Sequence, residues 1–215
     1  MPMTLQDFLS DADAEVRAII AAEFKIEVVE TTTVPSFDDP AITYDNRDTQ
    51  VKRCKLLESC VLYVDIRNSS TISAERQSVT LARMYSTFVR MMIKCARHYG
   101  GRVRNIIGDR VMVVFDRQDC FVNAVRTAIL CQTVAQKIID RRITSFAFKC
   151  GVGIDFGKML IVKAGASRRG AEMEFYRSHV WLGRPANVAS KLTDIAAKPR
   201  VIKSGGYLRV GLYFR

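Results

Sequence analysis

Residues 61–70 have the sequence VLYVDIRNSS, and residues 100–115 have the sequence GGRVRNIIGDRVMVVF. The first stretch predicts an apolar strand that ends at Asp65, and the second predicts two strands joined by a turn that contains Asp109. If these strands are neighbours in a sheet, the two carboxylates converge beside a loop of small polar residues. Paired carboxylates in that setting can bind two divalent cations, and such cations can hold the phosphates of a nucleotide. The two stretches therefore predict a phosphoryl-transfer site.

The composition is that of a globular protein with a sizeable core. The chain has 215 residues, of which 48% are hydrophobic and 26% charged, and its formal net charge is +11. The basic residues are scattered and match no DNA-binding motif, so we expect no nucleic-acid partner. The six cysteines are well separated, and no apolar run approaches the roughly 20 residues of a membrane span. We therefore expect a cytoplasmic protein with reduced thiols and no membrane contact.

Hydrophobic patterning divides the chain near residue 50 into an N-terminal extension, 1–50, and a catalytic domain, 51–215. In the extension we expect a helix at 4–24 and a strand at 26–34. In the domain we expect a strand at 59–65, a helix at 74–99, a hairpin at 102–115, a helix at 119–141, and strands at 146–155 and 158–162 joined by a tight turn at Phe156 and Gly157. This βαββαβ order predicts an α+β, ferredoxin-like fold, with helices on one face of an antiparallel sheet and the other face uncovered.

Both expected domain helices carry one apolar stripe that would face the sheet. In the first helix the stripe comprises Leu81, Tyr85, Phe88, Met92, Cys95 and Tyr99. In the second helix it comprises Ala124, Ala128, Cys131, Ala135 and Ile138.

Four motifs, in this order along the chain, resemble those of the class III nucleotidyl cyclases, the family of adenylate and guanylate cyclases. They are VDIR at 64–67, GG at 100–101 before IGD at 107–109, CGVGIDFG at 150–157, and LG at 182–183 leading to NVASKL at 187–192. The resemblance covers about residues 60–197. It implies an enzyme that cyclises a nucleoside triphosphate and works as a head-to-tail homodimer, with each active site shared between two chains.

The resemblance also implies roles for particular residues. Asp65 and Asp109, with the carbonyl of Ile66, would hold two Mg²⁺ or Mn²⁺ ions. Asn187 and Lys191 stand where the family carries an asparagine and an arginine that orient the ribose and neutralise the transition-state phosphate. Lysine keeps the charge but lacks the bidentate fork, so we expect weaker transition-state stabilisation. The backbone amides that would cradle the phosphates are those of Arg67, Asn68, Ser69 and Ser70.

The positions that read the base depart from those of purine cyclases. Asn105 and Val180 stand where adenylate cyclases carry a lysine and an aspartate or threonine, and neither purine-reading pair is present. In this the chain resembles the standalone pyrimidine cyclases of bacterial antiphage defence, which make cyclic UMP or cyclic CMP. We expect conversion of UTP to cyclic UMP, with Arg104 as the candidate base reader. Cyclisation of CTP or ATP, and a catalytically weak nucleotide-sensing protein, remain as alternatives.

Overall fold

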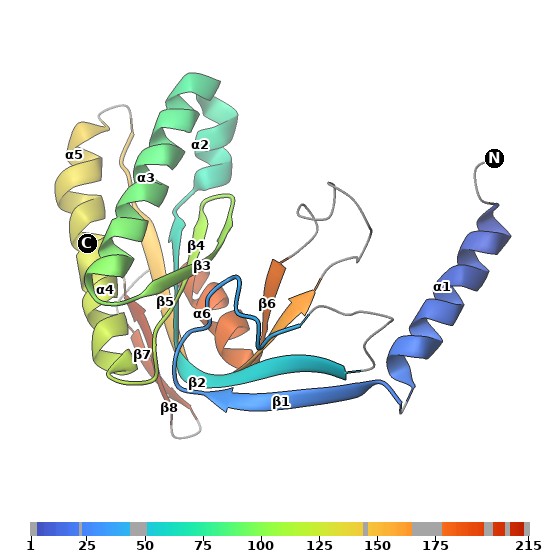
Figure 1. Cartoon of the computed structure of the whole chain (residues 1–215). Coiled ribbons are helices and arrows are strands. Elements are labelled where there is room, and N and C mark those ends of the chain that lie inside the picture. Colours follow the sequence, from blue (N-terminus) through green and yellow to red (C-terminus); the bar gives the residue numbers. More distant parts are fainter. Residues whose placement is uncertain are drawn as a thin grey trace. The chain divides into compact units, whose positions relative to one another are not determined.

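A computed structural model describes residues 4–21, 23–43, 51–143, 146–164, 178–195, 200–204 and 207–212 (Figure 1). The chain divides into two compact units. The first comprises residues 1–29, 37–55 and 161–180. The second comprises residues 30–36, 56–160 and 181–215.

The described elements include both helices and strands. In chain order they are α1 (Leu5–Ile20), β1 (Lys25–Thr31), β2 (Val51–Ile66), α2 (Ser69–Glu75), α3 (Ser78–His98), β3 (Arg102–Ile107), β4 (Arg110–Val114), α4 (Cys120–Val134), a π-helical turn (Ala135–Ile139), α5 (Asp140–Arg142), β5 (Cys150–Ala164), β6 (Ser178–Leu182), α6 (Arg184–Ile195), β7 (Arg200–Ser204) and β8 (Tyr207–Leu212). The strands follow the sheet order β3-β4-β2-β5-β8-β7, with β1 paired to β2 and β6 paired to β5.

The second unit contains the expected strand and helix order, and the α+β class is confirmed. Strand β4 pairs antiparallel with both β2 and β3. The register places Val64 opposite Val111, which sets the end of β2 beside the start of β4. The β3–β4 hairpin turns at Gly108, whose φ of 59° lies in the left-handed region that glycine adopts readily.

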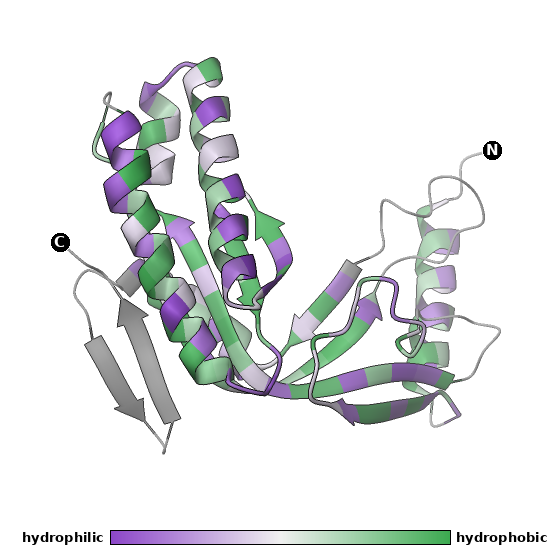
Figure 2. Ribbon diagram, turned by 60° about the vertical axis from the view of Figure 1, so that its left-hand side comes forward, coloured by the Kyte–Doolittle hydropathy of each residue, from purple (hydrophilic) through white to green (hydrophobic). Residues whose placement is uncertain are grey.

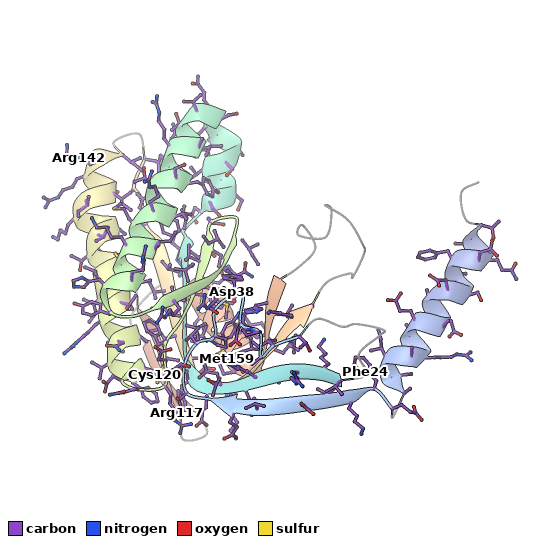
Figure 3. All side chains as sticks on the ribbon, viewed as in Figure 1. Phe24, Asp38, Arg117, Cys120, Arg142 and Met159 are labelled. Atoms are coloured by element: carbon purple, nitrogen blue, oxygen red, sulfur yellow. The ribbon has the colours of Figure 1, made fainter. Side chains whose placement is uncertain are left out.

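Helices α3 and α4 cover one face of this sheet and form the main core. Every second residue of β2, from Cys60 to Ile66, belongs to this core, together with Phe88 and Met92 of the predicted α3 stripe. Figure 2 shows hydrophobic residues interspersed with hydrophilic ones along both the helices and the strands. Cys120, labelled in Figure 3, begins α4 and is buried in the same core. Because side chains alternate along a strand, the intervening residues point to the opposite face.

Two helix predictions need correction. The helix expected at 74–99 is two helices, α2 and α3, because Arg76 and Gln77 both have extended backbone angles. The helix expected at 119–141 contains the π-helical turn, whose wider spacing shifts the phase of the helix by one residue. As a result Ile139 is buried, whereas Ile138 of the predicted stripe is 53% exposed.

The prediction of a turn at Phe156 and Gly157 is wrong, because β5 continues through both residues without a break. Glycine is needed there for close packing: a Cβ on Gly157 would lie 2.9 Å from Cγ of Pro185. A Cβ on Gly151 or Gly153, which lie on the same side of β5, would lie 2.5 Å or less from a backbone carbonyl of α6. The sheet face expected to be uncovered is therefore covered by α6 along β5.

The first unit holds α1 and the parts of β1 and β2 at residues 25–29 and 51–55. A capping box between Thr4 and Asp7 begins α1. Lys55 makes a 2.7 Å ion pair with Asp39, and the buried Lys163 donates a 2.6 Å hydrogen bond to the Asp39 carbonyl. Within the described ranges, no helix is long and apolar enough to span a membrane.

Candidate active site

Asp65 and Asp109 approach each other on the sheet face opposite α3 and α4. Asp65 is the second-last residue of β2, and Asp109 is in the turn between β3 and β4. Oδ1 of Asp65 and Oδ2 of Asp109 are buried, and neither accepts a hydrogen bond from the described part of the chain. Buried carboxylate oxygens without donors are costly unless a cation binds them. The two aspartates therefore fit the donor set that a divalent cation requires.

The environment of Asp65 perturbs its ionisation. Burial, together with the carboxyl group of Asp109, raises the pKa of Asp65 to about 6, although hydrogen bonds from Arg110 act in the opposite direction. Two adjacent carboxylates and one guanidinium leave a net negative charge at this point of the sheet. Among the described residues, no group of three or more acidic, cysteine or histidine side chains is arranged so that it could hold a metal ion. Further cation ligands would come from backbone carbonyls, water or substrate phosphates, as is usual for Mg²⁺.

The loop after Asp65 leads directly into α2. Ile66 is buried as the last residue of β2, and the amide of Arg67 already donates a 2.9 Å hydrogen bond to the Lys149 carbonyl. Asn68 has a left-handed φ of 55° and precedes α2. The amides of Ser69 and Ser70 lie in the first turn of α2, where backbone donors have no acceptor within the helix. Of the four backbone amides predicted to bind phosphate, that of Arg67 therefore already has an acceptor. Those of Ser69 and Ser70 remain able to donate to a phosphate oxygen.

Asn187 and Lys191 are one turn apart on α6, and both are exposed. Neither makes a hydrogen bond or ion pair with a described residue. The neighbouring Ser190 and Asp194 instead contact Arg110, whose Nη1 donates to Oγ of Ser190 at 2.7 Å. Arg110 was not predicted as a site residue, although a charged residue directly after Asp109 is a signal that could have indicated it.

The candidate base readers lie on two different strands. Asn105 of β3 pairs with Met112, which places it on the same sheet face as Asp65. The register shifts between Val103 and Asn105, so Arg104 is at a β-bulge, where it is half-buried. Burial and the charge of Arg102 lower the pKa of Arg104. Val180 is half-buried in β6 of the first unit.

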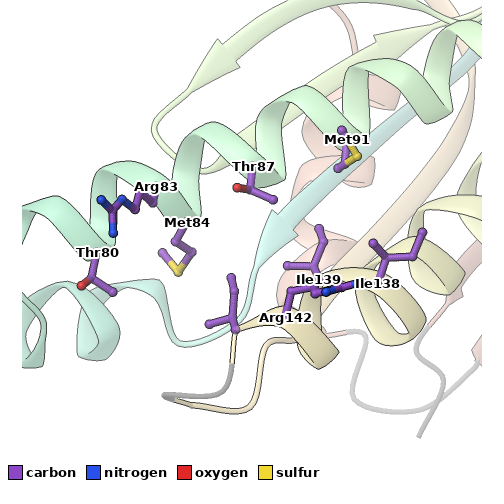
Figure 4. Close-up of a pocket in the computed structure, with 9 residues that line it drawn as sticks. Thr80, Arg83, Met84, Thr87, Met91, Ile138, Ile139 and Arg142 are labelled. Atoms are coloured by element: carbon purple, nitrogen blue, oxygen red, sulfur yellow. The ribbon is translucent and has the colours of Figure 1, made fainter.

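A separate cavity of about 400 Å³ lies between α3 and the π-helical turn (Figure 4). It contains none of the candidate residues. Its lining residues are Thr80, Arg83, Met84, Thr87, Met91, Ile138, Ile139, Arg142 and Ile143.

The fold and the paired aspartates are those of a nucleotidyl cyclase. Residues 51–209 match the family described as the adenylate and guanylate cyclase catalytic domain, and the chain belongs to this class III family. Enzymes of this class generally depend on divalent metal ions.

Two curated relatives are both named uridylate cyclase. The one from Burkholderia cepacia is 31% identical over 85% of this chain and 76% of its own length. The one from Xanthomonas perforans is 31% identical over 76% of this chain and 70% of its own length. Among solved structures, an adenylyl cyclase from P. aeruginosa is similar in fold, with a TM-score of 0.60 at 20% identity over 76% of this chain and 97% of that one.

Proposed function

We propose that this protein is a homodimeric, divalent-cation-dependent uridylate cyclase that converts UTP to 3′,5′-cyclic UMP and pyrophosphate. The observation that carries the proposal is the 31% identity, over most of the chain, to two proteins named uridylate cyclase. Asn105 and Val180 also differ from the residues with which purine cyclases recognise their base, and this difference supports a pyrimidine substrate.

Asp65, Asp109 and the carbonyl of Ile66 would hold the two Mg²⁺ or Mn²⁺ ions. The donor-free oxygens Oδ1 of Asp65 and Oδ2 of Asp109 support this assignment. Bound cations of this kind lower the pKa of the ribose 3′-hydroxyl and stabilise the pyrophosphate leaving group. The chain itself contributes the buried carboxylates, and the amides of Asn68, Ser69 and Ser70 would hold phosphate oxygens.

Asn187 and Lys191 would orient the ribose and neutralise the charge that develops on the α-phosphate. Both side chains are exposed and have no described partner, so they are free to reach the aspartates of a second chain. This supports a head-to-tail homodimer in which each active site combines the aspartates of one chain with α6 of the other.

Base selection is assigned to Arg104 and Asn105. A guanidinium can donate to the carbonyl at position 4 of uracil, whereas cytosine presents an amine at that position. To test the role of Arg104, the turnover of UTP and of CTP is measured for Arg104→Ala and, as a control, for Arg102→Ala. We expect the ratio of UTP to CTP turnover to fall only in Arg104→Ala, and an unchanged ratio would contradict the assignment.

The product would act as a second messenger in antiphage defence, a role that rests on the resemblance to pyrimidine cyclases of that system. Cells that express the wild-type protein with its genomic neighbours should resist phage, and cells that express Asp109→Ala should not. Equal phage plating on both strains would contradict this role.

One experiment tests the proposed reaction. The purified protein is incubated with Mn²⁺ and each of the four nucleoside triphosphates in turn, and the products are identified by mass. Cyclic UMP should form fastest. Faster formation of cyclic AMP would indicate an adenylate cyclase, and nucleotide binding without any cyclic product would favour a sensing protein.

A further inference from the structure

Arg110 makes contacts that no motif of the sequence explains. Its Nε and Nη2 donate to Oδ2 of Asp65 at 3.0 and 2.5 Å. Its Nη1 donates to Oγ of Ser190 at 2.7 Å, and Nη2 also lies 3.3 Å from Oδ1 of Asp194. One guanidinium thus joins the end of β2 to two residues of α6 that are one helical turn apart. The planar fork of arginine suits this kind of bridge, which lysine cannot form.

Arg110 occupies only one oxygen of Asp65. The other, Oδ1, stays buried without a donor, as does Oδ2 of Asp109. Carboxylates that ligate metals are commonly held in orientation by hydrogen bonds to the oxygen that faces away from the metal. Arg110 makes this kind of contact to Asp65.

Helix α6 also contacts Arg67 and strand β5. Nη1 of Arg67 donates a 2.9 Å hydrogen bond to the Asp194 carbonyl. A Cβ on Gly151 would lie 2.5 Å from the Thr193 carbonyl, so the C-terminal half of α6 lies directly on β5. The arginine that follows Asp109 and the arginine two residues after Asp65 therefore both anchor the same end of α6.

This anchoring sets the direction of Asn187 and Lys191. At 3.6 residues per turn, Ser190 and Asp194 form a stripe beside the one that carries Asn187 and Lys191. The contacts that Arg110 makes with Ser190 and Asp194 fix the rotation of α6 about its axis. They therefore fix where the exposed side chains of the second stripe point.

We infer that Arg110 is a positioning residue that couples the two active sites of the dimer. The inference rests on the proposed shared site, in which α6 of each chain serves the aspartates of its partner. Within one chain, Arg110 then joins Asp65 of one active site to the helix that completes the other. A change in the hydrogen bonding of Asp65 at the first site is transmitted through Arg110 to the ribose and phosphate contacts of the second.

The first test measures Mn²⁺ binding by electron paramagnetic resonance, without nucleotide. Arg110→Gln removes most of the hydrogen bonding that orients Asp65, so Mn²⁺ should bind about tenfold or more weakly. At the same time kcat should fall about tenfold, because misplacing a substrate-positioning group by about 1 Å can cost that much or more. Arg126→Gln, an exposed change on α4, is the control and should alter neither quantity. Unchanged Mn²⁺ binding would show that Arg110 does not orient Asp65 and would overturn the inference.

The second test uses mixed dimers with a single working site. One chain carries Asp109→Ala and supplies only α6, and its partner carries Lys191→Ala and supplies only the aspartates. Adding Arg110→Gln to the chain that supplies α6 should lower kcat about tenfold, although the aspartates of that chain take no part in the reaction. Arg110→Lys on the same chain should also lower it, because charge alone does not rebuild the bridge. Arg126→Gln on that chain should leave it unchanged.

The outcomes separate the inference from the function on which it rests. A mixed dimer whose kcat is insensitive to Arg110→Gln on the α6 chain would overturn the coupling and leave the proposed function intact. An inactive parent pair, after verified subunit exchange, would contradict the shared site and the coupling together. The Mn²⁺ measurement would still decide whether Arg110 orients Asp65 within one chain. Any nucleoside triphosphate that the protein cyclises serves as substrate, so the test does not depend on a preference for UTP.

Discussion

At the scale of single residues, the ionisation of Asp65 links cation binding to pH. Burial and the nearby Asp109 raise the pKa of Asp65 to about 6, so the carboxylate is fully formed only above that pH. Below it a cation must displace a proton, and the ionised fraction falls about tenfold for each further pH unit. We expect the Mn²⁺ affinity of the protein to be steady from pH 7 to 8 and to weaken between pH 6 and 5. Titrations followed by electron paramagnetic resonance measure it, and an affinity that is flat to pH 5 would contradict the role of Asp65.

Asp109 offers a second test at this scale. Asp109→Asn keeps the shape of the side chain but removes the charge that a divalent cation needs. We expect cyclase activity to fall by about two orders of magnitude or more, because the transition-state stabilisation that a cation supplies is worth several kcal/mol. The melting temperature of the cation-free protein should not fall, since Oδ2 of Asp109 has no described donor to lose. Near wild-type turnover by the folded variant would remove the cation assignment.

At the scale of elements, the glycines of β5 determine how closely α6 packs on the sheet. A Cβ at Gly153 would lie 2.7 Å from Cβ of Leu192 and still closer to the Ala189 carbonyl, and a backbone carbonyl cannot move aside without shifting the helix. Gly153→Ala should therefore destabilise the protein by about 1–3 kcal/mol, as overpacking does. It should also lower activity by moving Asn187 and Lys191. Chemical denaturation measures the first effect, with the exposed Ser86→Ala as control, and unchanged stability would contradict this packing.

The elements also show what the sequence could predict and what it could not. Local patterns predicted the β3–β4 hairpin, the α3 stripe and the two aspartates, because each depends on residues close together in the chain. The break at Arg76 and Gln77 contains neither glycine nor proline, so no turn signal marked it. The glycines of β5 predicted a turn but instead admit α6, which only the tertiary structure reveals. Arg110 and Asp194 are 84 residues apart in the chain, so no local sequence pattern indicates that they are in contact.

At the scale of the whole molecule, the proposed active site is divided between two chains, so activity should depend on protein concentration. The described residues place the aspartates beside Arg110 and leave Asn187 and Lys191 exposed and without partners. A single chain then holds two half-sites and no complete site. When a site requires a dimer, its population is inseparable from the concentration of the chains.

Dilution tests this division directly. The initial rate per chain should be constant while the dimer persists and should fall in proportion to protein concentration once dissociation dominates. Sedimentation measured across the same range should show the loss of dimer where the rate per chain begins to fall. Lys191→Ala, which changes an exposed side chain, should dissociate at the same concentration as the wild type while being far less active at every concentration. A species that sediments as a monomer and keeps its full rate per chain would show that one chain completes its own site, and the shared arrangement would be wrong.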